Sequence, residues 1–276
     1  MTAGRPSLGD TIVLADVGNT RIKLAVLVEL DAGQAARRLP SVSRRQELLS
    51  RDFRPANLQR WLEAAAPGPA VLLVAGVNQA AAVRLEAAVA ELAVTGHRPL
   101  RQRRIGHTDL PLEVRVDEPH RVGIDRLAGA AAAAVAKAPG RSAIVVDCGT
   151  ATTVDLVSVE GHFLGGAILP GPALLARALA EGTSRLPEVA ALDRDPPPAM
   201  PGRSTQTAIA AGIGWGMRGA VARLVDEGRG MLGGDPEVIL TGGSAGVVRD
   251  ALPGAVELPD LVLSGIALAA ERACAR

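Results

Sequence analysis

Residues 13–28 read VLADVGNTRIKLAVLV, and residues 144–159 read IVVDCGTATTVDLVSV. Both stretches contain an apolar run, an Asp, one intervening residue, a Gly, a Thr-bearing turn and a second apolar run. Apolar runs rich in β-branched residues on either side of a Gly turn predict a β-hairpin. Because this strand–turn–strand pattern occurs twice, the sequence predicts two related lobes.

Helices and strands alternate along the rest of the chain, which indicates α/β layers. Apolar periodicity predicts helices over residues 58–66, 80–94, 124–137, 172–180 and 205–231, with further helices at the C-terminus. Buried strands are predicted over residues 70–75, 143–147 and 238–240, and a third, Gly-rich hairpin over residues 161–171.

Two stretches break this alternation. Residues 100–121 are rich in Arg and Pro, so we expect a boundary near Pro119, with one lobe over residues 1–118 and the other over residues 119–276. Residues 196–201 are rich in Pro and predict a surface loop.

The composition excludes several classes of protein. A chain of 276 residues can form two modest domains, and a formal net charge of +1 creates no general attraction to nucleic acid or to an anionic membrane. The apolar stretch Leu127–Ala136 is too short to span a bilayer, and Met1–Thr11 lacks the pattern of a secretory signal. Cys148 and Cys274 show no metal-ligand or disulfide spacing. We therefore expect a cytoplasmic protein without nucleic-acid or membrane partners.

The first Gly turn has the groups that bind a phosphorylated ligand. Gly18 lets the backbone approach such a ligand closely, and the hydroxyl of Thr20 can donate to phosphate oxygens. Asp16 can hold Mg²⁺ against those phosphates, and Lys23 adds a positive charge. The alternative is an ordinary hairpin turn with an Asp-capped loop.

The second Gly turn repeats this chemistry. Asp147 offers another cation ligand, and Thr150, Thr152 and Thr153 offer hydroxyl donors beside Gly149. Neither turn matches the G-x-x-x-x-G-K-[ST] phosphate loop or the G-x-G-x-x-G dinucleotide fingerprint. A plain turn is again the alternative.

Residues 119–126, PHRVGIDR, precede a predicted helix. Asp125 is placed to accept a proton from a substrate hydroxyl, and Arg126 to hold an anionic group. The alternative is that Asp125 only caps the helix. Phosphoryl transfer depends mainly on positioning and charge, so one carboxylate with cations would suffice.

Three further segments contain Gly at the ends of predicted elements. Residues 165–171, GGAILPG, allow close approach to a ligand or form a tight hairpin. Residues 241–245, TGGSA, end a strand where amides attract phosphate or accept a nucleotide base. Residues 202–205, GRST, open a helix that Ser204 or Thr205 caps.

Taken together, these motifs resemble those of type III pantothenate kinases, members of the acetate and sugar kinase, Hsp70 and actin superfamily that are also known in some bacteria as an accessory transcription factor (Bvg accessory factor). The resemblance covers residues 12–270 and rests on DVGNTRIK, PHRVGIDR, DCGTATT, GGAILPG, GRST and TGG in this order. It implies two actin-like (ribonuclease H-like) lobes with a nucleotide cleft between them, and ATP-dependent phosphorylation of pantothenate.

The resemblance also implies roles for individual residues. ATP phosphates would contact Asp16, Val17, Gly18, Asn19, Thr20, Arg21, Ile22, Lys23 and Thr150. Pantothenate would contact Gly123, Ile124, Asp125, Arg126 and Thr205, with Asp125 as the proton acceptor. Asp147 would bind the monovalent cation, K⁺ or NH₄⁺, that the family requires. The family resemblance further implies a homodimer with its substrate site near the subunit interface.

One position departs from the family pattern. Val116 stands where the family commonly has a Tyr that touches pantothenate, and the chain contains no Tyr. The contact with the substrate on that side is therefore altered. Two other functions stay open: a kinase of the same superfamily that acts on a sugar or a small acid, and a nucleotide-binding regulatory protein without turnover.

Overall fold

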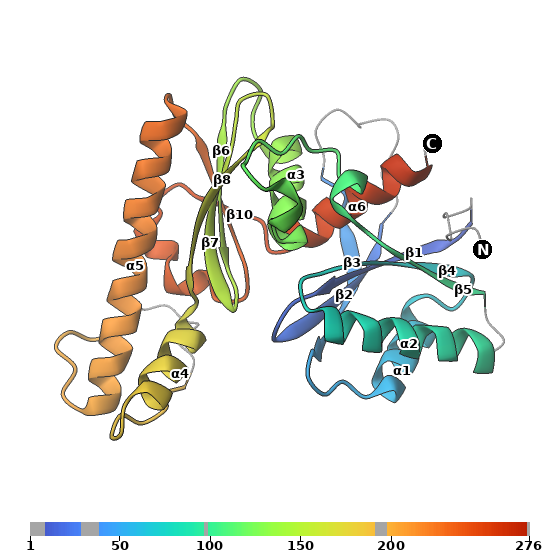
Figure 1. Cartoon of the computed structure of the whole chain (residues 1–276), viewed down its shortest axis with the longest axis horizontal. Coiled ribbons are helices and arrows are strands. Elements are labelled where there is room, and N and C mark those ends of the chain that lie inside the picture. Colours follow the sequence, from blue (N-terminus) through green and yellow to red (C-terminus); the bar gives the residue numbers. More distant parts are fainter. Residues whose placement is uncertain (1–8, 29–38, 97–98, 191–197, 275–276) are drawn as a thin grey trace. The chain divides into compact units, whose positions relative to one another are not determined.

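The computed structural model describes residues 9–28, 39–96, 99–190 and 198–274. The chain forms two compact units (Figure 1). The first unit comprises residues 1–113, 117–136 and 260–276, and the second comprises residues 114–116 and 137–259.

The first unit contains a five-stranded sheet. Its strand order is β3 (Val42–Leu49), β2 (Arg21–Leu27), β1 (Thr11–Val17), β4 (Ala70–Gly76) and β5 (Leu100–Arg104). Strand β2 is antiparallel to both β1 and β3, whereas β4 runs parallel to both β1 and β5. The first predicted hairpin is therefore the centre of a mixed sheet.

The sheet of the second unit has the same topology. Its order is β8 (Phe163–Pro170), β7 (Ala151–Val157), β6 (Ala143–Cys148), β9 (Glu237–Thr241) and β10 (Val256–Glu257). Pairing is again antiparallel along the first three strands and parallel from β6 through β9 to β10. Two units with this strand order confirm the actin-like, ribonuclease H-like α/β fold that the repeated motif predicted.

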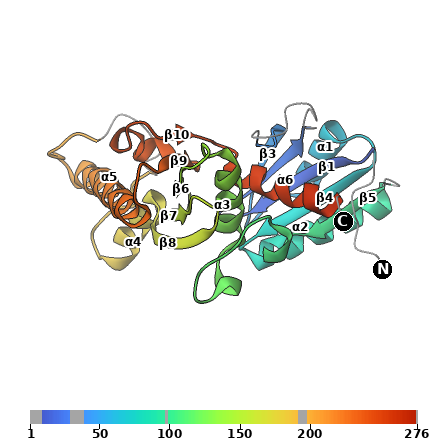
Figure 2. The same cartoon turned by 90° about the horizontal axis from the view of Figure 1, so that it is seen from above.

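Helices cover both faces of the first sheet (Figure 2). On one face, α1 (Pro55–Ala65) and α2 (Gln79–Thr95) bury apolar side chains against Val13, Ala15 and Val17. On the other face lie α3 (Ile124–Ala136) and α6 (Leu261–Cys274), which pack on each other and on β1 and β4. Because the face of α3 that meets α6 consists of small residues, the two helices can approach closely.

The α3–α6 crossing depends on one glycine. A methyl group at Gly265 would overlap the backbone carbonyl of Ala128 in α3. The first turn of α3 contains Asp125, so the backbone-to-backbone contact at Gly265 sets the position of that carboxylate relative to the sheet.

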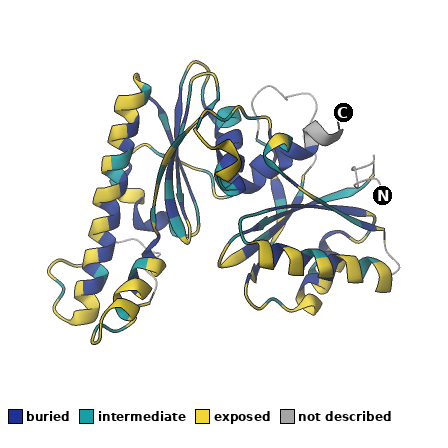
Figure 3. Ribbon diagram, viewed as in Figure 1, coloured by how far each residue is buried: buried dark blue, intermediate teal, exposed yellow. Residues whose placement is uncertain are grey.

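The second unit contains α-helices beside its sheet, α4 (Pro172–Gly182) and the 28-residue α5 (Thr205–Leu232). The buried side of α5 repeats an apolar residue every fourth position, which forms a stripe along the helix; its members are Ile209, Ile213, Met217, Val221 and Val225. This stripe meets Ile144, Val146 and Val154 of the sheet, and Figure 3 shows the opposite side of α5 exposed.

Most predicted elements are confirmed, but edge strands were missed and one predicted hairpin is wrong. Strands β3 and β5 were not predicted, since both are edge strands with many polar side chains. Residues 161–171 form the single strand β8 instead of a hairpin, because the turn lies earlier, where Gly161 N donates to Ser158 O (3.0 Å). Residues 196 and 197 of the predicted Pro-rich loop lie outside the described residues.

The division into units also differs from the one expected at Pro119. Residues 117–136 and 260–276 belong to the first unit, because α3 and α6 pack on β1 and β4. Among the described residues, no helix has the length and apolarity needed to cross a membrane.

We predict that Gly265→Ala lowers the free energy of unfolding by about 1–3 kcal/mol, the usual cost of overpacking, because the methyl group must push α3 and α6 apart. Gly219→Ala is the matched control. Gly219 also lies within a helix, but a methyl group there would meet open space, so this variant should be slightly stabilised. Urea denaturation compares the two variants, and equal stabilities would contradict the prediction.

Candidate active site

The first Gly turn is held in place by the end of β3. The turn closes where Gly18 N donates to Arg21 O (2.9 Å). Ser50, which is fully buried, donates from its hydroxyl to Gly18 O (2.7 Å) and from its backbone amide to Thr20 O (3.0 Å). These bonds fix the turn carbonyls towards Ser50. In the sequence, Ser50 is marked only as the first polar residue after the apolar pair that ends β3.

The register of the hairpin places the two charged residues of this turn together. Asp16 on β1 is paired with Lys23 on β2, and paired residues on antiparallel strands point to the same face. Arg21 instead forms an exposed ion pair with Glu47 (2.7 Å). The hairpin therefore presents a carboxylate and an ammonium side by side at its turn end.

The end of β4 meets the end of β1 at Gly76. A methyl group at Gly76 would lie 2.5 Å from Cβ of Val17, so only glycine fits at this position. Directly after it, Val77 N donates to Val17 O (3.1 Å), and Asn78 caps α2 by accepting from Ala81 N (3.0 Å). Sequence reasoning missed this segment, although a Gly after a strand and an Asn before a helix were both visible.

Asp125 lies near this edge of the first sheet because Gly123, two residues before it, packs against the edge. Gly123 lies against Val77, whose Cγ1 would be 3.4 Å from a methyl group at Gly123. Asp125 Oδ1 accepts a hydrogen bond from Arg126 N (2.8 Å). Among the described residues, Oδ2 of Asp125 has no hydrogen-bond partner. The first unit thus brings together Val17, Gly76, Val77, Gly123 and Asp125.

The second Gly turn is built in the same way. Gly149 N donates to Ala151 O (2.9 Å), and Asp147 on β6 is paired with Thr153 on β7. The carbonyl of Thr150 accepts from Gly171 N (3.0 Å), so the end of GGAILPG lies against the turn.

Gly242 completes the second site as Gly76 completes the first. Its φ of +95° is in the region that favours glycine, and a methyl group there would lie 2.5 Å from both Asp147 Oδ1 and Cys148 O. Ser244 N donates to Cys148 O (2.9 Å). Three predicted motifs, DCGTATT, GGAILPG and TGG, therefore meet around Asp147 in the second unit.

Cys148 lies between these groups but cannot serve as a nucleophile. Burial, followed by the charge of Asp147, raises the pKa of the Cys148 thiol to about 12, although a hydrogen bond with Thr152 opposes the shift. At neutral pH the side chain is an uncharged thiol that packs in the core of the second unit.

The remaining predicted site residues lie elsewhere in the second unit. Thr205 is the first residue of α5, directly after the cap residue Ser204. Val116 lies beside Gly165 at the start of β8, where its Cγ1 would be 3.4 Å from a methyl group at Gly165.

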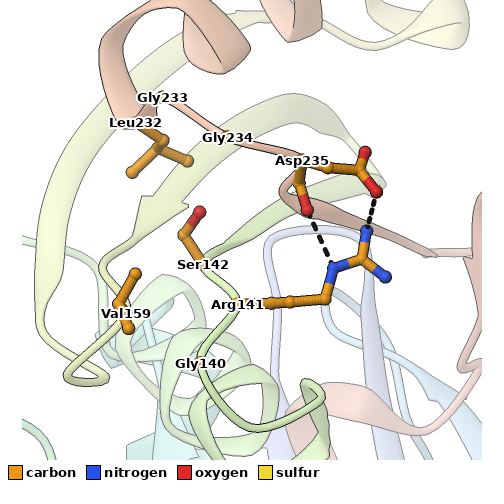
Figure 4. A pocket seen from close by; sticks show the side chains of 8 residues that line it. All are labelled: Gly140, Arg141, Ser142, Val159, Leu232, Gly233, Gly234 and Asp235. Atoms are coloured by element: carbon orange, nitrogen blue, oxygen red, sulfur yellow. Dashed lines mark hydrogen bonds and ion pairs between the residues drawn. The ribbon is translucent and has the colours of Figure 1, made fainter.

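Two hollows lie in the second unit. A hollow of about 640 Å³ separates α4 from α5, and apart from Thr205 it is lined by nonpolar residues, among them Leu175, Leu179 and Ile213. The other, about 520 Å³, lies at the start of β6 (Figure 4), where Arg141 donates from Nε to Asp235 O (2.8 Å) and from Nη2 to Asp235 Oδ2 (2.8 Å). No residue that the sequence predicted as functional lines this second hollow.

The family model described as type III pantothenate kinase matches residues 12–227, a range that includes both Gly turns, PHRVGIDR and GRST. The chain belongs to the type III pantothenate kinase family.

Relatives named type III pantothenate kinase align with the chain to different extents. The one from Rhodopirellula baltica is 38% identical over 271 residues, which cover 91% of this chain and 95% of the relative. The one from Alkalilimnicola ehrlichii is 45% identical over 147 residues, covering 53% of this chain and 57% of the relative. The one from Thermus thermophilus is 41% identical over 149 residues, or 52% of this chain and 56% of the relative.

A solved structure shares the fold. It is a Baf family protein from Campylobacter jejuni, named as a candidate transcriptional activator, with a TM-score of 0.53 and 19% identity. The alignment covers 94% of this chain and 97% of that protein. At this identity the similarity shows the fold alone.

Proposed function

We propose that the protein transfers the γ-phosphoryl group of ATP to pantothenate, giving 4'-phosphopantothenate, the first step of coenzyme A biosynthesis. The family match over residues 12–227 carries this proposal, because it covers both Gly turns and Asp125. Since ATP is the phosphoryl donor, the proposed setting is the cytoplasm. A coupled ADP-release assay with pantothenate tests the proposal directly, and no ADP release above background would refute it.

We assign ATP binding to the first Gly turn, residues Asp16 to Lys23, and to Thr150 in the second. Their support is the geometry of two buttressed turns, each with a carboxylate at the end of its central strand. Among the described residues, no three or more acidic, His or Cys side chains gather as a metal cluster. The carboxylates at the two turns suit Mg²⁺, which is commonly held by one or two carboxylates together with substrate phosphates. Asp16 would supply such a carboxylate, and the ion would neutralise phosphate charge.

Asp125 is proposed as the general base. Its Oδ1 accepts the Arg126 amide, which orients the carboxylate, and Oδ2 is available to accept the proton of the pantothenate hydroxyl. The transfer itself needs positioning and charge stabilisation more than covalent help. Gly123, Ile124 and Arg126 would hold pantothenate beside this base.

Val116 and Thr205 are proposed as further pantothenate contacts. The Thr205 hydroxyl, in the first turn of α5, can hydrogen-bond a polar group of pantothenate. Val116 offers only a small apolar face in place of the aromatic hydroxyl that the family commonly has, so it would contact the substrate without a hydrogen bond.

Asp147 is proposed to bind the monovalent cation, K⁺ or NH₄⁺. It lies on β6 beside Gly242, whose lack of a side chain lets its backbone approach the Asp147 carboxylate. Close backbone approach of this kind lets carbonyl oxygens supplement a carboxylate around a weakly charged ion.

We also propose that the protein is a homodimer formed through the hollow between α4 and α5. Nonpolar residues line it almost throughout, and Leu174 and Leu179 of α4 are partly exposed. Exposed apolar surface of this kind marks an interaction site. A second copy of the chain is the occupant that the family resemblance favours.

Two other functions compete with this proposal. One is a kinase for a sugar or a small acid, which the same assay detects when those compounds replace pantothenate. The other is a regulatory protein that binds nucleotide without turnover. This alternative is considered because the Campylobacter jejuni protein that shares the fold is named as a candidate transcriptional activator. Measured ADP release with pantothenate would exclude it.

We predict that Asp125→Asn lowers kcat by at least about 10²-fold, because the amide cannot accept the hydroxyl proton. ATP binding should change little. Asp117→Asn is the matched control: it removes an exposed carboxylate from the same segment and should keep full activity. Steady-state kinetics and ATP titration test this, and near-normal turnover of Asp125→Asn would remove the residue from the mechanism.

Asp147→Ala should lose activity together with the dependence on added K⁺, since both are assigned to one carboxylate. Asp235→Ala, which removes an exposed carboxylate from the same unit, should behave like the wild type. Activity is measured in buffers containing only Na⁺ or only K⁺. A wild-type enzyme equally active in both would disprove the cation assignment.

Leu179→Glu should convert the homodimer to a monomer, because a charge would be buried in an apolar interface. Val94→Glu provides the control, since Val94 is an exposed apolar residue of α2 in the other unit. Light scattering coupled to size exclusion gives both masses. A wild-type monomer at micromolar concentration would show that the dimer proposal is wrong.

A further inference from the structure

The segment Pro198–Ser204, here called the GRST loop, packs tightly on the helix that follows it. Trp215 of α5 donates from its indole Nε1 to Pro198 O (3.0 Å). Beside this bond, the ring of Pro198 lies directly on the backbone of Gly214, where a methyl group would be 2.7 Å from Pro198 Cδ. One turn of α5 therefore holds the start of the loop through a hydrogen bond and a close contact.

The buried guanidinium of Arg218 supports the Trp215 ring. The guanidinium of Arg218 lies 5.6 Å from the centre of the indole ring, within the range of a cation–π interaction. Arg218 is only 4% exposed; it donates from Nε to Asp250 Oδ1 (2.7 Å) and from Nη1 to Gly214 O (3.1 Å). A buried side chain of the second unit thus supports the Trp215 ring that holds the loop.

The other end of the loop is the N-terminus of α5. Gly202 lies against the first turn, where a methyl group would be 2.5 Å from the carbonyl carbon of Thr207. Ser204 and Thr207 cap each other: Ser204 Oγ accepts from Thr207 N (3.2 Å), and Thr207 Oγ1 accepts from Ser204 N (2.9 Å). Thr205 lies inside this capping box, so its hydroxyl is positioned by the loop as well as by the helix.

We propose that Trp215 is a positioning residue for pantothenate, which acts by holding the GRST loop so that Thr205 reaches the substrate. This inference rests on the proposed function. A helix end frays when its cap is not held, and a shift well below 1 Å is enough to weaken a directed hydrogen bond. Trp215 would therefore govern the KM for pantothenate without touching pantothenate or ATP.

Trp215→Phe is the test variant, because it keeps an aromatic ring over Arg218 and removes the donor to Pro198. Since 46% of Trp215 is exposed, the smaller ring leaves no core cavity. We expect KM for pantothenate to rise roughly 3- to 10-fold, the effect of one lost neutral hydrogen bond. KM for ATP and kcat should stay near their wild-type values.

The chain supplies a matched control. Its other tryptophan, Trp61, also donates from Nε1 to a backbone carbonyl, that of Arg44 (3.1 Å), but in the first unit. Trp61→Phe removes the same kind of bond and should leave KM for pantothenate unchanged. A rise in KM with both variants would mean a general effect of lost stability and would overturn the proposal. Light scattering on Trp215→Phe checks that the oligomeric state matches that of the wild type.

A double-mutant cycle asks whether Trp215 acts through Thr205. Thr205→Val removes the hydroxyl that the loop is proposed to position. In that background, Trp215→Phe should raise KM for pantothenate no further, because the contact it supports is already absent. Independent effects, in which the two fold-changes multiply, would overturn the proposal.

The wild-type assay separates the two levels of inference. Wild-type turnover of pantothenate with an unchanged KM in Trp215→Phe refutes the role of Trp215 and leaves the proposed function intact. Absence of wild-type turnover refutes the proposed function, and the role of Trp215 with it.

Discussion

At Val17 and at Cys148, the last residue of each central strand lies against a glycine of the parallel strand beside it. Gly76 and Gly242 occupy equivalent places in the two sheets, and a methyl group at either would lie 2.5 Å from the neighbouring strand. The close approach brings the backbone that follows each glycine onto the carbonyl of the central strand, through Val77 N and Ser244 N. Both Gly turns are therefore supported from the side by backbone.

The two units use this shared frame differently. In the first unit, Val77, which follows Gly76, lies against Gly123. The helix α3, which is not part of the repeated strand–turn–strand pattern, therefore places Asp125 near this edge of the sheet. In the second unit, the equivalent glycine contacts the Asp147 carboxylate itself. Different segments therefore fill the space beside the two turns, and the carboxylates proposed as proton acceptor and as cation ligand come from different parts of the repeated plan.

Elements that are determined by neighbouring residues could be predicted from the sequence, whereas features that depend on contacts with distant segments could not. Both hairpins were predictable because a Gly turn separated two apolar runs, and α5 because of its four-residue apolar spacing. Strand β3 was not, since pairing with β2, and not its own residue pattern, holds the polar residues Gln46 and Glu47 in extended backbone. In the same way, Asp16 and Asp147 could be named as candidates from their motifs. The supports of the turns, Ser50 and Gly76, become visible only when strands 30 to 60 residues away are placed beside them.

The α3–α6 crossing has a thermodynamic consequence for Asp125. The buried face of α3 is composed largely of alanine, from Ala130 to Ala133, and these side chains have no rotamers to lose when the helix packs. The helix can therefore be fixed closely against α6 at little cost in side-chain conformational entropy. An added methyl group at Gly265 would meet the backbone of Ala128 and not a side chain, so the adjustment must be made by the backbone of the helix that carries the carboxylate.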